Sequence, residues 1–131
     1  MRLSTAARNA QVAAVTALID AGTGPGVLQL RDGTAPAGPG STATGTLLAS
    51  FTLADPAFAA PTGGTGTADV DPALTATAAD TGTPTWYRIL DSAGTPLADG
   101  DVATDMTITP SAVTVGATVT LTAWTLTAPA A

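Results

Sequence analysis

The sequence predicts a mainly β fold, a β-sandwich or a small barrel of about seven to eight short strands, with one N-terminal α-helix. Apolar residues recur at helical spacing only near the start of the 131-residue chain. After Gly26, short alternating runs follow one another, separated by turns that contain Gly, Pro or Asp at intervals of roughly ten residues. We expect a single domain over residues 1–131, with a helix at 5–21, a β body at 27–127 and a loose tail at 128–131.

The helix at 5–21 is predicted by its cap, its periodicity and its end. Either Ser4 or Thr5 can cap the first turn. The apolar residues form two stripes at helical spacing: Val12, Val15 and Ile19, and Leu3, Ala7, Ala10, Ala14 and Leu18. Gly22 suits the position just after the last turn, and Gly24-Pro25-Gly26 prevents the helix from continuing.

Alternating runs predict strands at 27–31, 45–53, 67–79, 85–90, 96–98, 106–109 and 113–127. Pro72 splits the third run. In the second run, Leu47, Ala49, Phe51 and Leu53 share one face, and Leu48 lies on the other. In the run at 85–90, Trp86, Arg88 and Leu90 share one face, and Tyr87 and Ile89 share the opposite one.

The last run, 113–127, changes phase within its length. Val113 to Ala123 place their apolar residues on odd positions, but Trp124 and Leu126 stand on even positions. Such a change indicates a β-bulge or a switch between sheets. Among the connections, residues 34–44 are rich in Pro and Gly and predict an exposed loop, and Phe58 is expected to enter the core from a loop.

The ionisable residues exclude several kinds of chemistry. All ten acidic residues are Asp and all four basic residues are Arg, so Lys, Glu, His and Cys are absent and the net charge is −6. This composition excludes Ser–His–Asp and Cys–His catalysis, thiol chemistry, zinc fingers, Schiff-base formation and the P-loop lysine. The shortage of Arg argues against nucleic-acid binding, and no apolar run is long enough to span a bilayer. We therefore predict no enzyme, no catalytic residue, no cofactor, no nucleic-acid partner and no membrane partner.

Two acidic clusters are candidates for metal sites. Asp99, Asp101 and Asp105 lie in DGDVATD, which begins like a calcium loop. The chain has no Glu to complete such a loop, so a hydrophilic turn is the preferred interpretation. Asp69 and Asp71 similarly serve as turn residues ahead of Pro72. No metal site is predicted.

The chain contains 26 Thr, and its strand surfaces are nearly uncharged. Uncharged strand edges are poorly protected against pairing with other chains, so we expect the protein to assemble with copies of itself. Arg88 is expected either to stack on Trp86 or to pair with an Asp of its own chain or of a neighbour. The aromatic residues are expected chiefly in the core. The candidates for contacts with other subunits are Arg2, Arg8, Arg31, Arg88, Trp86 and Trp124.

Four segments resemble a group of small virion proteins of tailed bacteriophages that occur among head-gene products. They are ALIDAGTGPGVLQLRDGTAP (17–36), GTLLASFTLADPAF (45–58), TGTPTWYRILDSAGTPLADGDV (81–102) and VTVGATVTLTAWTLTAPA (113–130). The resemblance implies a structural virion protein and carries no catalytic motif.

Within that group, the resemblance favours a capsid decoration (cement) protein that binds the outer shell. Its partners would be the major capsid protein and further copies of itself. It would be made in the host cytoplasm and reside on the capsid surface of the virion. The alternatives are a tail or head–tail connector protein, or a host-surface-binding module of the tail. The helix and the 34–44 loop are the segments expected to make the contacts.

Overall fold

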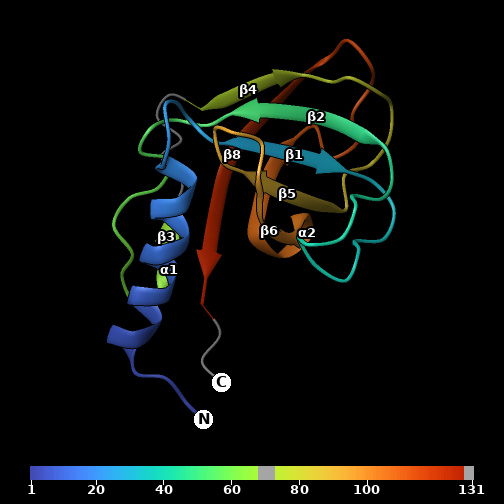
Figure 1. The fold of residues 1–131 in the computed structure, drawn as a ribbon. Coiled ribbons are helices and arrows are strands. Elements are labelled where there is room, and N and C mark those ends of the chain that lie inside the picture. The colour runs from blue at the N-terminus through green and yellow to red at the C-terminus, as the bar shows by residue number, and fades with distance from the viewer. Residues whose placement is uncertain (68–72, 129–131) are drawn as a thin grey trace.

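The computed structural model describes residues 1–67 and 73–128 and places one long helix beside two antiparallel sheets (Figure 1). Its elements are α1 (Thr5–Asp20), β1 (Val27–Arg31), β2 (Leu47–Thr52), β3 (Thr65–Thr67), β4 (Leu74–Thr77), β5 (Trp86–Leu90), β6 (Pro96–Asp101), α2 (Val102–Asp105), β7 (Met106–Thr109) and β8 (Thr118–Thr127). The predicted mainly β fold with an N-terminal helix is confirmed. The described strands form a sandwich-like pair of sheets and not a closed barrel.

Helix α1 packs on the body through one of its two apolar stripes. Ser4 is the cap, and its hydroxyl accepts a hydrogen bond from the Ala7 amide at 3.2 Å. Val12, Thr16 and Ile19 are buried, whereas Leu18 on the other stripe is 54% exposed. The helix ends at Asp20, and Gly22 follows with a φ of 97°, in the left-handed region that glycine adopts without a steric penalty.

The first sheet has the strand order β2-β1-β5-β6. Strand β1 is central, and its Leu28 lies between Phe51 of β2 and Ile89 of β5. The β1–β2 register shifts at Leu30 and Arg31, whose partners are Ala49 and Leu47. Leu48 falls in this irregularity and is fully buried in the same core as Ala49, so the strict alternation predicted for this strand is interrupted here.

The second sheet is built on β8. Strands β3 and β4 pair with its C-terminal and N-terminal parts, and β7 also pairs with it. Thr107 pairs with Ala123 and Ile108 pairs with Leu121, which leaves Thr122 as the extra residue. This shift confirms the change of phase predicted before Trp124, because the bulge returns the buried face from odd to even positions.

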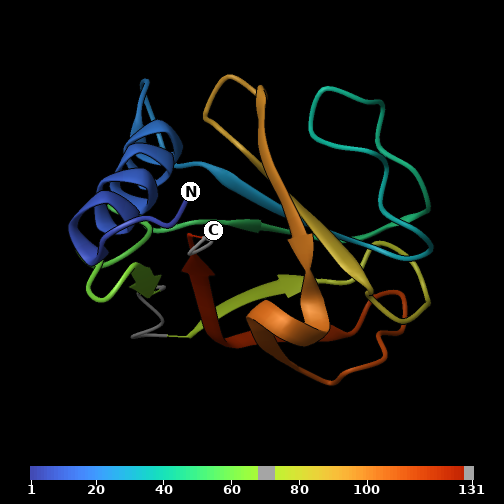
Figure 2. The same ribbon diagram turned by 90° about the horizontal axis from the view of Figure 1, so that it is seen from below.

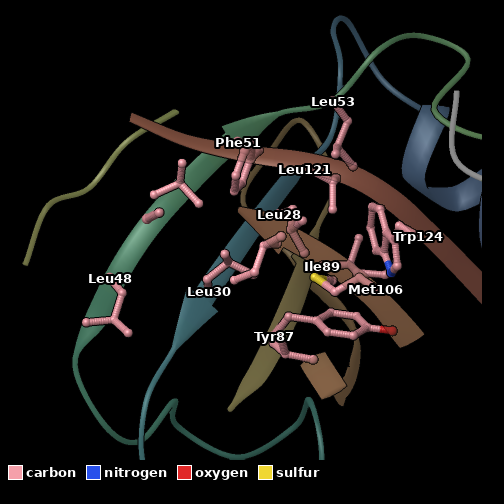
Figure 3. Close-up of a cluster of buried hydrophobic side chains, with 14 of the residues drawn as sticks. Leu28, Leu30, Leu48, Phe51, Leu53, Tyr87, Ile89, Met106, Leu121 and Trp124 are labelled. Atoms are coloured by element: carbon pink, nitrogen blue, oxygen red, sulfur yellow. The ribbon is translucent and has the colours of Figure 1, made fainter. Parts of the chain in front are cut away.

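The two sheets and α1 enclose one apolar core (Figure 3). Leu28 and Leu30 of β1 and Leu121 of β8 are completely buried, and Trp124 is 1% exposed. Phe58 enters from a loop, as predicted, and its ring centroid lies 4.6 Å from that of Trp124 in an edge-to-face arrangement. The few large side chains of the chain are therefore concentrated where the two sheets meet.

Several predicted boundaries need correction. The last strand begins at Thr118 instead of residue 113, because Gly116, with a φ of 83°, turns the chain. Strand β6 extends to Asp101, and the one-turn helix α2, which periodicity did not predict, follows it directly. Ala128 is not part of a loose tail, because its amide donates to the Gly64 carbonyl at 3.0 Å. Pro72, Asp69, Asp71 and the remaining tail, 129–131, lie outside the described residues.

We predict that Val119→Ala lowers the free energy of unfolding by about 2 kcal/mol, because it removes fully buried methyl groups and leaves a cavity. Val115→Ala is the matched control, since Val115 is 59% exposed in the preceding turn; its effect should stay within about 0.5 kcal/mol. Urea unfolding of both variants measures the difference. Equal effects would contradict the placement of β8 at the centre of the core.

Candidate functional site

The most highly connected polar side chain is Arg88, on the outward face of β5. Its guanidinium forms a two-pronged ion pair with Asp99 of β6: Nε lies 2.7 Å from Oδ1 and Nη2 lies 3.0 Å from Oδ2. The same group donates to the backbone carbonyls of Ser41 at 2.9 Å and Gly38 at 3.2 Å. Arg88 is only 4% exposed, and the hydrogen bond to Asp99 raises its pKa further above the ordinary value.

The 34–44 loop is consequently tied to the first sheet. It lies on the side of the molecule away from α1 (Figure 2). Trp86 is 2% exposed beside it, and its indole N–H donates to the Asp32 carbonyl at 3.0 Å. Arg88 also stacks on Trp86, with Cζ 5.5 Å from the ring centroid. Both interactions considered for Arg88 from the sequence, stacking and an ion pair within its own chain, are therefore present.

The six predicted contact residues do not form one surface. Trp124, Trp86 and Arg88 are buried. Arg8 of α1 donates through Nε and Nη2 to the Ala128 carbonyl, at 3.1 and 2.9 Å, and thereby joins the helix to the end of β8. Arg31 is half-buried and donates to the Gln29 side chain and, at 3.5 Å, to the Gly45 carbonyl. Arg2 is exposed and has no ion pair or hydrogen bond among the described residues.

The three aspartates of DGDVATD have separate structural roles. Asp99 pairs with Arg88, Asp101 caps α2 by accepting hydrogen bonds from the Ala103 and Thr104 amides, and Asp105 accepts one from the Tyr87 hydroxyl. The segment is thus a strand end and a helical turn in place of the hydrophilic turn expected. Over residues 1–67 and 73–128, no three Asp side chains come together as metal ligands would.

Tyr87 and Asp105 form a polar pair at the border of the core. The Tyr87 hydroxyl lies 2.7 Å from Oδ2 of Asp105, and burial, reinforced by this hydrogen bond, raises the pKa of Tyr87. The Tyr87 ring lies edge-to-face against Trp124, with 5.5 Å between the centroids. The tyrosine hydroxyl and the indole nitrogen lie on the same side (Figure 3), yet the indole N–H has no hydrogen-bond acceptor among the described residues.

A cavity of about 260 Å³ lies between α1, β6 and β8 and is lined by this polar pair. Val12 and Val15 of α1 and Leu126 of β8 form its apolar wall. The sequence offered no signal for it, because its lining comes from residues that are far apart along the chain. Of the two residues in the polar pair, the sequence assigns only Tyr87 to a strand face, through the alternation in the run at 85–90.

We predict that Arg88→Ala lowers the free energy of unfolding by about 3 to 5 kcal/mol, because it leaves Asp99 buried without its counter-charge. Hydrogen exchange of the amides in 34–44 should also accelerate, since two of the loop's carbonyls lose their donor. Arg31→Ala on the neighbouring strand is the control and should cost less than about 1 kcal/mol. Equal losses for the two variants would contradict the role assigned to Arg88.

We predict that the unfolding free energy falls as the pH rises above about 10, by up to about 1.4 kcal/mol per pH unit. The Tyr87 pKa is higher in the folded than in the unfolded chain, so this stabilisation is complete below the unfolded value and is lost above it. Tyr87 is the only tyrosine, so the absorbance of its phenolate reports on this group alone. Tyr87→Phe should remove the phenolate absorbance and make the unfolding free energy less dependent on pH above about 10. An unchanged pH dependence in that variant would contradict the assignment to Tyr87.

Comparison of the chain with protein-family models, with curated proteins and with solved structures finds no match. Among the described residues, no helix is both long and apolar enough to cross a membrane.

Proposed function

We propose that this chain is a structural virion protein of a tailed bacteriophage, and specifically a capsid decoration protein that binds the outside of the shell in many copies. The observation that carries the proposal is the resemblance of four ordered segments to small phage virion proteins. These segments supply β1, β2, β5, β6 and all of β8, together with the loop residue Phe58. The resemblance therefore covers the whole first sheet and the central strand of the second, whereas β3, β4 and β7 lie outside the four segments.

The surface of α1 is compatible with this role. The helix turns an uncharged face of small side chains outward, formed by Ala6, Ala10, Ala13, Ala14, Ala17 and Leu18. Small, uncharged side chains permit close contact with another protein at a low cost of desolvation. Many weak contacts of this kind on one lattice would add up to firm attachment through avidity.

The two segments expected to make contacts lie on opposite sides of the molecule. Helix α1 stands at one side of the sandwich and the 34–44 loop at the other (Figures 1 and 2). The loop is tied down by Arg88, so it offers a defined shape in place of a flexible one. A subunit with contact surfaces on two sides can meet the shell with one and a neighbouring subunit with the other.

We predict that the purified protein binds expanded capsids that lack it, saturably and in a fixed ratio to the capsid subunits. Co-sedimentation with increasing amounts of protein measures the ratio. Binding to whole host cells without binding to capsids would overturn the proposal in favour of a host-surface module. Attachment at a single vertex, or only to tails, seen by electron microscopy, would overturn it in favour of a connector or tail protein.

The contact made by α1 is tested in the same assay. Leu18→Glu places a charge on the outward helix face, and we expect it to weaken capsid binding about tenfold or more, because an unpaired charge must then be desolvated. Thr75→Glu adds the same charge at an exposed position of β4 and is the matched control. Equal binding by the two variants would exclude α1 as the contact and leave the 34–44 loop.

A further inference from the structure

The cavity between α1, β6 and β8 combines an apolar wall with a single uncompensated carboxylate. Val12, Val15, Ala98 and Leu126 contribute the apolar side chains, and Tyr87 and Asp105 contribute polar groups. A volume of about 260 Å³ accommodates a small organic group.

Asp105 brings a negative charge to the cavity without a basic partner. Its Oδ2 accepts the Tyr87 hydroxyl, and no Arg of the chain forms an ion pair with it; the ion pair among the described residues is the one between Arg88 and Asp99. Asp99 also lines the cavity, but both of its oxygens are engaged by Arg88. Arg8 borders the lining, but its guanidinium donates to the Ala128 carbonyl and forms no ion pair with Asp105. The half-buried carboxylate of Asp105 is therefore the acidic group of the cavity that has no basic partner.

These features select an organic cation. An anionic ligand would be repelled by Asp105, and a neutral apolar ligand would remove water from the carboxylate without replacing its hydrogen bonds. An ammonium group can donate to the carboxylate of Asp105 and to the phenol oxygen of Tyr87, and it is attracted to the face of an aromatic ring. A short alkyl chain would then lie against Val12, Val15 and Leu126.

We propose that this cavity binds a primary alkylammonium group, carried either by a free amine or by a lysine side chain of a partner protein. The chain itself has no Lys, so a lysine side chain in this cavity would belong to another molecule. The inference goes beyond the proposed attachment to a capsid and does not rest on it. Its test uses the isolated protein, so that failure of one proposal leaves the other standing.

The probe is n-butylammonium, whose carbon chain and charge match a lysine side chain, and 1-butanol is the neutral control. Titration is followed by the methyl resonances of Val12, Val15 and Leu126 in nuclear magnetic resonance spectra. We expect saturable shifts at these methyls and at least about tenfold weaker binding of 1-butanol. Shifts spread over other surfaces, no saturable shift, or equal affinity for the two probes would overturn the proposal.

Two carboxylate variants separate the specific contact from the general negative charge. Asp105→Asn should weaken butylammonium binding about tenfold or more. Asp101→Asn removes the same charge close by, outside this cavity, and should leave the affinity within about twofold, since Asn also caps α2. An equal loss of butylammonium affinity in both variants would show that only the net charge of the protein matters, and would overturn the proposal.

A third variant tests the location of the ligand independently of Asp105, in case Asp105→Asn does not fold. Ala98→Leu fills the cavity from β6 and should abolish binding of butylammonium and of 1-butanol alike, whereas retained binding would place the ligand elsewhere. The source of the ammonium group is distinguished with Nα-acetyl-lysine methylamide. If this compound binds with an affinity comparable to that of butylammonium, the ammonium group can come from a lysine of a partner protein. If it does not bind while butylammonium does, the ligand is a free amine.

Discussion

The guanidinium of Arg88 joins the paired strands β5 and β6 to the 34–44 loop. It holds β5 to β6 through Asp99, and it holds the 34–44 loop through the carbonyls of Gly38 and Ser41. Because a buried charge without its partner is costly, this arrangement permits little alternative placement of the loop. It also explains why β5 is buried on both faces: Tyr87 and Ile89 face the core, while Trp86 and Arg88 are covered from outside.

The aspartates serve the fold in the same way. Asp20, Asp32 and Asp91 accept backbone N–H groups at turns or between distant segments, and Asp101 accepts them at the start of α2. These carboxylates satisfy donors that would otherwise be left without a partner in the many turns of a small β protein. These four carboxylates hold backbone N–H groups, whereas Asp99 and Asp105 line the cavity, and of these two only Asp99 is paired with an Arg.

This distribution bears on both proposals. The three most connected Arg side chains are occupied within the chain, so attachment to a shell would rely on neutral surfaces such as the outward face of α1 instead of a basic patch. The cavity, in contrast, offers one charge in an apolar setting. Attachment and ligand binding would therefore use different physical interactions at different places, shape complementarity at α1 and a charge-assisted hydrogen bond at Asp105.

The sequence by itself determined the elements whose signals are local. The helix is visible from Ser4, its apolar stripe and Gly22; β1 and β5 follow from alternation, and the bulge before Trp124 follows from a change of phase. Local pattern did not distinguish the two stripes of α1, did not show that Leu48 is buried, and did not reveal α2, because these depend on which surface each residue meets. The partners of Arg88, the cavity and the separate roles of Asp99, Asp101 and Asp105 were decided only by the tertiary structure. They join residues whose proximity is created by strand pairing across the chain, and no spacing along the sequence encodes that proximity.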